Sequence, residues 1–379
     1  MVRVALVTSS FLPRFGGVEE HVLHVARDLR RRGHHVVVWA VDQGDETPDE
    51  VDGIGLRYLP CPMPARDLGA LARFAAGAPG ALRAWRAAAR ADRPDVVHVH
   101  CYGPNGPWAD LAARRAGVPL VLSSHGETFA DAHGVFDRSR LLASALRRSL
   151  RRAAAVTGPS RYTLDDLVRR FGLTPGGGVV VPNGIDPAEP AAPRPAWLPG
   201  RYVLAVGRMV GVKGFDLLVD AYAHADPGGV SLVIAGDGPD REGLRRRADE
   251  LGLRERVVLP GRLSRPEVVT AMRSAALVVV PSRVESFGIV VLEAWRAGVP
   301  VVATTRGGPP EFVADGENGL LVDPADTPAL AAAICRVLDD DALARRLGET
   351  GGQAVGAYTW RAVGDRYAKL YGAAGVPAR

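Results

Sequence analysis

The sequence predicts an α/β protein made of two doubly wound domains, and three observations carry this prediction. Short apolar runs alternate with longer segments of helical periodicity along the chain, which is the pattern of parallel sheets covered by helices on both faces. A segment with five prolines and no periodicity, residues 187–200, interrupts the alternation near the middle. The length of 379 residues suits two domains that each bury a core.

The first domain is predicted to span residues 1–186 and to take its strands from six apolar runs. The N-terminal run is only about one strand long and leads into Gly16 and Gly17, which favours a core strand over a signal peptide. No apolar run approaches the roughly 20 residues that span a bilayer, so we expect a cytoplasmic protein. The six runs are Val4–Val7, Val36–Val41, Val96–Val99, Leu120–Leu122, Ala153–Thr157 and Val179–Val181.

The proline-rich residues 187–200 predict a semi-rigid linker to the second domain, residues 201–358. In that domain Ser264, Pro266 and Glu267 form a capping box with proline in the first turn, which opens a helix ending near Ser274. The strands of the second domain are predicted at Tyr202–Val206, Leu232–Ala235, Val257–Leu259, Leu277–Val280 and Val299–Ala303.

Composition excludes some functions and leaves others open. A net charge of +5 and a pI near 9.4 suit an anionic ligand, but no basic run with interleaved aromatic residues indicates nucleic-acid binding. The three cysteines lack metal-ligand spacing. Lysine is nearly absent: the 47 basic residues include two lysines, which leaves 47 − 2 = 45 arginines. One of the two lysines is Lys213.

Two glutamates eight positions apart, Glu285 and Glu293, surround a predicted strand end and helix start. The preceding apolar run predicts a buried strand and the residues after it a helix, which places Glu285 in the loop and Glu293 on the helix. Backbone N–H groups at a helix start attract anions, so we expect a diphosphate at Ser286, Phe287 and Gly288. The alternative is a pair of solvated surface carboxylates.

A glycine-rich turn with two cations follows the predicted strand Tyr202–Val206. Arg208 and Lys213 lie between Gly207 and Gly214, and glycines allow the backbone to approach an anion closely while the cations pair with it. The turn therefore predicts a second contribution to a diphosphate site, with an ordinary charged surface loop as the alternative.

Together these motifs resemble the family-4 glycosyltransferases, which are retaining enzymes with the GT-B fold. The resemblance runs through the chain in a shared order, over Phe15-Gly16-Gly17-Val18-Glu19, Ser124-His125-Gly126-Glu127, Val181-Pro182-Asn183-Gly184-Ile185-Asp186, Gly207-Arg208 with Lys213-Gly214, Ala235-Gly236-Asp237-Gly238-Pro239, Glu285 to Glu293, and Gly307-Gly308 with Glu311. It implies two Rossmann-like domains facing across an interdomain cleft. It also implies that a last helix, within residues 359–379, crosses back to the first domain.

The resemblance assigns roles to single residues. It implies that Glu285 contacts the donor sugar or the reacting face and that Glu293 binds the ribose hydroxyls, for which a carboxylate is a suitable acceptor. It places the nucleotide base at Arg262 and Leu263, the diphosphate at Gly16, Gly17, Arg208, Lys213 and residues 286–288, and the acceptor at Gly17, Glu19, His125 and Glu127. The catalytic set implied is His125, Glu285, Arg208 and Lys213.

The predicted reaction moves a hexosyl group from a nucleotide-sugar, with a UDP-sugar favoured over a guanosine donor, to a hydroxyl of an unidentified acceptor. No metal is expected, because the only Asp-x-Asp spacing lies in Asp339-Asp340-Asp341 between helical patterns, so fixed cations must stabilise the departing diphosphate. Front-face displacement is implied by the resemblance, and a covalent glycosyl-enzyme stays open. The rival functions are a GT-B nucleotide-sugar epimerase, a two-domain sugar-binding protein and a catalytically silent partner subunit.

A basic amphipathic helix is predicted around residues 138–152. Its arginines and leucines suit contact with an anionic membrane, which would bring a lipid-linked acceptor within reach. The favoured alternative is that the leucines pack inward and the arginines face solvent.

Overall fold

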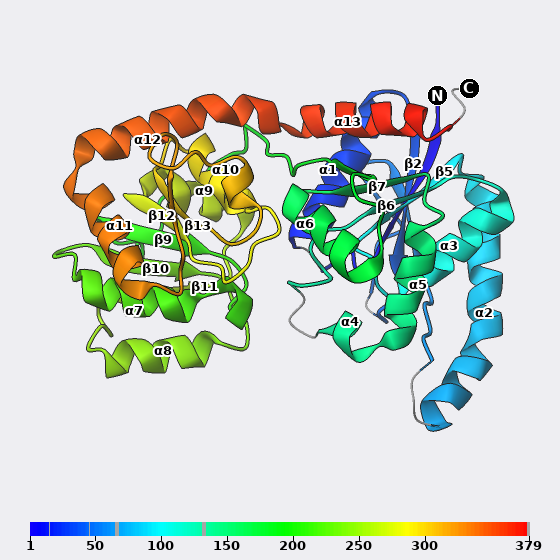
Figure 1. Cartoon of the computed structure of the whole chain (residues 1–379), viewed down its shortest axis with the longest axis horizontal. Coiled ribbons are helices and arrows are strands. Elements are labelled where there is room, and N and C mark those ends of the chain that lie inside the picture. The colour runs from blue at the N-terminus through cyan, green and yellow to red at the C-terminus, as the bar shows by residue number, and fades with distance from the viewer. Residues whose placement is uncertain (15, 45, 65–67, 131–133, 377–379) are drawn as a thin grey trace. The chain divides into compact units, whose positions relative to one another are not determined.

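A computed structural model describes residues 1–14, 16–44, 46–64, 68–130 and 134–376 (Figure 1). The chain forms two compact units, one of Met1–Asn183 with Trp360–Arg379 and one of Gly184–Thr359. The proline-rich segment 187–200 belongs to the second unit rather than standing between the two. There the Ala192 amide donates to the Pro266 carbonyl at 3.0 Å, and Thr270 Oγ1 donates to the Ala192 carbonyl at 2.6 Å.

The first unit contains an eight-stranded sheet in the order β3-β4-β2-β1-β5-β6-β7-β8. Neighbouring strands are parallel except for the hairpin of β3 and β4. The strands are β1 (Arg3–Thr8), β2 (His35–Val41), β3 (Glu50–Val51), β4 (Ile54–Leu59), β5 (Val96–His100), β6 (Leu120–Ser123), β7 (Ala155–Gly158) and β8 (Gly178–Val180). All six predicted strands are therefore present.

The prediction omits the hairpin of β3 and β4, although the sequence carries its signal. The turn residues Asp52 and Gly53 have φ values of 51° and 72°, and an Asp-Gly pair is favoured in a two-residue hairpin turn because both positions need positive φ. Strand β4 mixes buried and partly buried positions, so it lacks the continuous apolar run that identified the others.

Helices cover the sheet of the first unit, and the last helix of the chain packs among them. They are α1 (Gly17–Arg31), α2 (Leu68–Asp92), α3 (Asn105–Ala116), α4 (Val135–Arg138), α5 (Arg140–Leu150), α6 (Arg161–Asp166) with a π-turn at Leu167–Phe171, and α13 (Trp360–Ala373). The Trp360 ring stacks on His24 of α1 at 4.7 Å, and Arg32 pairs with Asp365 of α13. The expected return of the last helix to the first unit is confirmed (Figure 1).

Helix α5 is the predicted basic amphipathic helix, and most of its leucines face the core. Leu142, Leu146 and Leu150 are buried, whereas Leu141 is exposed. This arrangement agrees with the inward-packing alternative. No helix among the described residues is both long and apolar enough to cross a membrane.

The second unit contains a parallel six-stranded sheet in the order β11-β10-β9-β12-β13-β14. Its strands are β9 (Tyr202–Val206), β10 (Ser231–Ala235), β11 (Val257–Gly261), β12 (Leu277–Val280), β13 (Val301–Thr304) and β14 (Leu320–Val322). Its helices are α7 (Phe215–Ala225), α8 (Arg241–Glu250), α9 (Arg265–Ser274), α10 (Ile289–Arg296), α11 (Thr327–Asp339) and α12 (Asp341–Ala354), with 3₁₀ turns at Gly211–Lys213, Pro309–Glu311 and Val355–Tyr358. The prediction omits only β14, a short edge strand.

Helix α12 packs tightly on the end of α10, and this contact supports a stability prediction. A Cβ atom at Gly348 would lie 2.2 Å from the Gly298 carbonyl oxygen, whereas at Gly352 its nearest neighbour would be 3.5 Å away. Because overpacking against backbone forces a shift, we expect Gly348→Ala to lower the free energy of unfolding by about 1–3 kcal/mol. Gly352→Ala in the same helix should leave it unchanged or raise it by up to about 1 kcal/mol. Urea unfolding measures both, and equal effects would contradict the packing argument.

Candidate functional site

In the first unit, the predicted residues gather where neighbouring parallel strands end. Thr8 of β1 is in register with His100 of β5, and His100 with Ser123 of β6. Ligands of open parallel sheets bind at this carboxyl edge. Gly16 and Gly17 also lie there, at the start of the 15-residue helix α1. A Cβ atom at Gly17 would have no neighbour within 4 Å, whereas at Gly16 it would lie 3.0 Å from Glu19 Oε2, so the helix start has open space at Gly17 but not at Gly16. Phe15 of the same motif lies outside the described residues.

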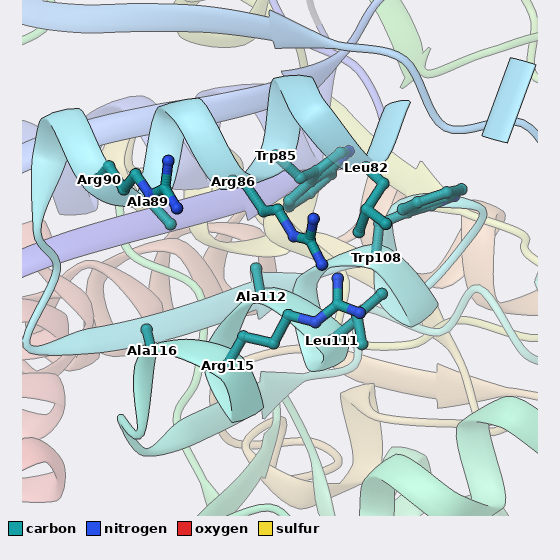
Figure 2. A pocket seen from close by; sticks show the side chains of 10 residues that line it. All are labelled: Leu82, Trp85, Arg86, Ala89, Arg90, Trp108, Leu111, Ala112, Arg115 and Ala116. Carbon is teal, nitrogen blue, oxygen red and sulfur yellow. The ribbon is translucent and has the colours of Figure 1, made fainter. Parts of the chain in front are cut away.

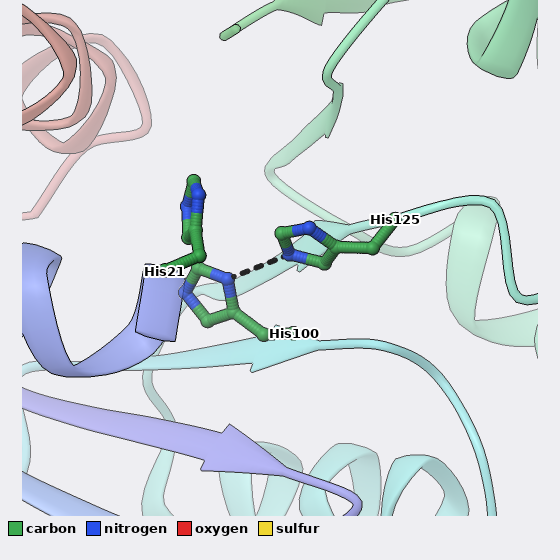
Figure 3. A group of neighbouring side chains, drawn as sticks. All are labelled: His21, His100 and His125. Atoms are coloured by element: carbon green, nitrogen blue, oxygen red, sulfur yellow. Dashed lines mark hydrogen bonds between the residues drawn. The ribbon is translucent and has the colours of Figure 1, made fainter. Parts of the chain in front are cut away.

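His125 follows β6 and lies in a cluster with His21 and His100 (Figure 3). His98 joins this cluster through its ring, whose centroid is 4.0 Å from that of His100. His100 Nδ1 and His125 Nε2 are 3.1 Å apart, and the rings of His21 and His125 meet edge to face with centroids 4.8 Å apart. His98 bonds to Tyr371 OH through Nδ1 and to Ser123 Oγ through Nε2, both at 2.7 Å. Sequence reasoning selected His125 alone and treated the other histidines as packing or surface residues.

Glu127, predicted to contact the acceptor, holds the loop that carries His125. Its carboxylate accepts from the amides of Tyr102 at 3.0 Å and His125 at 2.7 Å and from Ser124 Oγ at 3.0 Å. Burial raises the pKa of Glu127, and these hydrogen bonds offset only part of that shift. Glu19, in the first turn of α1, accepts from Ser10 Oγ.

The ring nitrogens of His21, His100 and His125 are close enough together to suggest a metal site, all lying within 4.8 Å of one another. Both nitrogens of His21 are already engaged, however, with Asn183 Oδ1 at 3.0 Å and with Tyr367 OH at 3.1 Å. A metal would have to displace one of these buried hydrogen bonds. The donor set therefore fits a hydrogen-bonded cluster better than a metal centre.

The buried histidines make the stability of the protein depend on pH. Burial lowers the pKa of His98 to about 3 and of His125 to about 4, and it lowers the pKa of His21 and His100 well below the usual range. The unfolded chain binds protons at these positions below about pH 6.5, whereas the folded protein does so only at lower pH. The stability that neutral histidines contribute is thus complete above pH 6.5 and is lost as the pH falls.

We expect the free energy of unfolding to fall between pH 6.5 and pH 4 by up to about 1.4 kcal/mol per pH unit for each such histidine. The raised pKa of Glu127 has the opposite effect, because the folded protein protonates this carboxyl more readily than the unfolded chain does. It is a single group, however, and the four histidines outweigh it. Urea unfolding at several pH values measures the slope, which His98→Gln should reduce and substitution of the exposed His35 should not. A flat profile between pH 6.5 and 5 would contradict the prediction.

In the second unit, Lys213 and Glu285 form an ion pair at the ends of the neighbouring strands β9 and β12. Lys213 Nζ lies 2.7 Å from Glu285 Oε2, which also accepts from Ser282 Oγ at 2.9 Å. Glu285 is 7% exposed. Burial alone would raise the pKa of Glu285, but the charge and hydrogen bond of Lys213 outweigh it and hold the pKa below its ordinary value. The carboxylate is therefore ionised at neutral pH.

Two glycines make the Lys213–Glu285 contact sterically possible. Gly214 has a φ of 65°, and a Cβ atom there would lie 2.1 Å from the Pro281 carbonyl oxygen. Gly307 has a φ of 115°, and its Cβ would lie 1.9 Å from the Glu285 carbonyl oxygen. The Gly308 amide donates to that same oxygen at 2.8 Å. Gly307 and Gly308 thus hold the loop of Glu285 through its backbone carbonyl group.

The remaining diphosphate candidates of the second unit follow the same two strands, β9 and β12, along the chain. Arg208 is exposed and has no ion pair among the described residues. Ser286 and Gly288 precede the first turn of α10, and Gly288 has a φ of 98°. The Phe287 side chain is buried and stacks on Phe312 with centroids 4.7 Å apart, so only its backbone is available to a ligand.

Glu293, the predicted ribose ligand, is 2% exposed and pairs with Arg265 at the start of α9. Arg265 also donates to both carboxylate oxygens of Glu189 at 2.8 Å, and Glu189 pairs with Arg296. Sequence reasoning missed Arg265 and Glu189, and Glu189 lies in the segment predicted as a linker. Arg262 is exposed and Leu263 partly buried just after β11.

A further cavity, of about 250 Å³, lies between α2 and α3. Trp85 and Trp108 contribute to its walls, and the side chains of Arg86 and Arg115 extend into the same space (Figure 2). None of the predicted site residues lines it.

Two family profiles match the chain. The profile "Glycosyltransferase Family 4" matches residues 15–189, and "Glycosyl transferases group 1" matches residues 196–354. Together they cover most of both units.

Several curated proteins are similar to this chain. Alpha-D-kanosaminyltransferase of Streptomyces kanamyceticus is 34% identical over 296 residues, which are 73% of this chain and 76% of that protein. Phosphatidyl-myo-inositol mannosyltransferase of Mycobacterium leprae is 33% identical over 94% of this chain and 92% of its own. A GDP-mannose-dependent alpha-mannosyltransferase of Mycolicibacterium smegmatis is 32% identical over 96% and 95%.

Solved structures share the fold. Sucrose-phosphate synthase from Thermosynechococcus elongatus aligns with a TM-score of 0.77 at 24% identity, covering 97% of this chain and 98% of its own. Anabaena HepE in complex with UDP aligns with a TM-score of 0.77 at 22% identity, covering 98% and 99%. At these identities the likeness concerns the fold alone.

Proposed function

The chain belongs to glycosyltransferase family 4, and we propose that it transfers a hexosyl group from a UDP-sugar to an acceptor hydroxyl with retention of anomeric configuration and without a metal. The observation that carries this proposal is the ion pair between the partly buried Lys213 and the buried Glu285, with the exposed Arg208 in the same loop as Lys213. Two fixed cations next to a helix start form a site for a departing diphosphate.

The roles of the second-unit residues follow from their chemistry. Arg208 and Lys213 neutralise the diphosphate as it leaves, together with backbone N–H groups at the start of α10. The ionised Glu285 accepts hydrogen bonds from donor sugar hydroxyls and orients Lys213. Glu293 has one carboxylate oxygen bound to Arg265 and accepts from the ribose hydroxyls with its remaining lone pairs. The base lies against the backbone of Arg262 and Leu263.

In this proposal the first unit supplies His125 and the start of α1 at Gly16 and Gly17 to the acceptor side. Glu127 serves through the loop it holds rather than by direct contact. Retention by front-face displacement fits the engagement of Glu285 with Lys213 and Ser282, because a carboxylate so occupied is a poor nucleophile. The reaction is proposed to take place in the cytoplasm.

The donor nucleotide is tested by calorimetric titration of UDP and GDP in buffer with a chelator. GDP is the necessary comparison, because a relative is named for its dependence on GDP-mannose. We expect UDP to bind without metal and Glu293→Gln to weaken it about 10- to 100-fold, since a hydrogen bond to a charged group contributes about 1.5–3 kcal/mol. Glu255→Gln, on the exposed surface of the same unit, should leave the affinity unchanged.

Each other result has a defined meaning. Tighter binding of GDP would replace the proposed donor. Binding that requires a metal would overturn metal independence, and absence of binding by either nucleotide would overturn the donor site. Interconversion of donor sugars without any acceptor would favour the epimerase.

A further inference from the structure

The contact between His100 and His125 allows only two proton arrangements when both rings are neutral. Either His100 Nδ1–H donates to His125 Nε2, or His125 Nε2–H donates to His100 Nδ1, across the same 3.1 Å. A neutral imidazole has one donor and one acceptor nitrogen. The direction of this hydrogen bond therefore also determines whether the outer nitrogen of each ring, His100 Nε2 or His125 Nδ1, carries a proton.

The outer nitrogen of His100 decides between the two arrangements. His100 Nε2 is one of two buried side-chain nitrogens or oxygens without a hydrogen-bond partner among the described residues. If His125 were the donor, the His100 proton would sit on Nε2 as a buried N–H without an acceptor. Unpaired buried N–H groups are rarer than under-satisfied acceptors. Donation from His100 leaves only an unused lone pair at Nε2 and is the favoured arrangement.

The outer nitrogen of His125 is in a different position. His125 Nδ1 has no partner among the described residues, yet it is absent from the buried unpaired atoms, so it is not fully buried. We propose that His100 is a positioning residue that fixes the tautomer of His125, which then presents a neutral Nδ1–H donor to the substrate. This inference rests on the proposed function and deepens it by defining the role of His125.

The assignment has a consequence for the reaction. The only basic nitrogen of His125 is occupied by His100, so His125 donates a hydrogen bond and accepts no proton. The proton of the acceptor hydroxyl must then go elsewhere, and in front-face displacement an oxygen of the departing diphosphate receives it. Burial, which lowers the pKa of both histidines, keeps the pair neutral at pH 7.

Long-range ¹H–¹⁵N NMR of histidine-labelled protein tests the tautomer directly, with His125→Gln used to assign the signal. We expect protonated Nδ1 and unprotonated Nε2 for His125 in the natural sequence. His100→Leu removes the donor and should move the proton of His125 to Nε2. It should also lower kcat about tenfold at unchanged KM, less than the roughly 10²–10³-fold loss when a catalytic donor is removed outright.

His98→Leu is the matched control, because His98 is equally buried on the same strand but bonds to Tyr371 and Ser123. It should leave the tautomer of His125 unchanged. His100→Asn, whose amide places an N–H near the position of Nδ1, should recover most of the activity lost in His100→Leu. If His100→Leu fails to fold, the spectrum of the natural sequence still decides.

A protonated Nε2 on His125 in the natural sequence would overturn the inference. So would equal loss of kcat in His98→Leu and His100→Leu with the tautomer of His125 unchanged. Absence of transferase activity with every donor would overturn the proposed function alone, because the NMR measurement requires no turnover.

Discussion

Replacing Lys213 by methionine is expected to lower kcat/KM by about 10²–10³-fold, the typical effect of removing one preorganised donor to developing charge. Lys213 Nζ lies 2.7 Å from Glu285 Oε2, so the substitution also leaves a buried carboxylate without its counter-charge. Lys213→Arg should recover little, because a planar guanidinium does not fit a site made for a compact ammonium group. Steady-state kinetics with the donor identified by calorimetry measures the loss.

The composition of the chain supplies a control for this substitution. Lys369 is the only other lysine and lies on α13, so Lys369→Met should leave kcat/KM within about twofold, the range of a surface change. Lys213→Met combined with Glu285→Gln should be little worse than either alone, since residues that act as a unit are non-additive. Fully multiplicative losses would show that the two residues act independently and would contradict the pairing.

Gly307→Ala is expected to lower kcat by roughly 10²-fold, the loss associated with about 1 Å of misplacement at a reacting centre. The new Cβ would lie 1.9 Å from the Glu285 carbonyl oxygen. Because this oxygen belongs to the backbone, no side-chain rotation can relieve the collision. The loop that carries Glu285 must therefore move. The kcat of the variant, compared with its UDP affinity and its melting temperature, separates misplacement from unfolding.

Gly316→Ala distinguishes collision from backbone strain. Gly316 has a φ of 76°, also in the left-handed region, but a Cβ there would meet nothing within 4 Å. Both variants introduce alanine at positive φ, and only the one at Gly307 touches the Glu285 loop. Comparable losses of kcat in the two would attribute the effect to strain and sink the role given to Gly307.

The central strands were predictable because their physical signal is strong. Strands such as β9 and β12 are almost entirely buried and read as uninterrupted apolar runs. The strands β3, β4 and β14 lie at or next to sheet edges. The length and hydrophobicity of such strands give only a weak sequence pattern. Only the turn at Asp52 and Gly53 signalled two of them, β3 and β4.

The candidate site residues could be proposed one by one from the sequence, but their arrangement could not. Lys213 and Glu285 each followed from a local pattern, yet their contact depends on β9 and β12 being neighbours in the sheet. Arg265 follows the N-cap residue Ser264, where an arginine usually faces solvent, so no local signal linked it to Glu293. The role of Glu127 also required the structure, because three of its hydrogen bonds come from loops at the ends of two strands.

The placement of α13 bears on the order in which the protein is completed during synthesis. Tyr367 and Tyr371, which bond to the buried His21 and His98, leave the ribosome only after every residue of the second unit. Domains fold as units while the chain emerges, usually in the order of synthesis. Residues 1–183 therefore cannot complete their core until α13 has been synthesised, because His21 and His98 lack their tyrosine partners until then. The second unit, although later in the chain, is the first that can reach its finished fold.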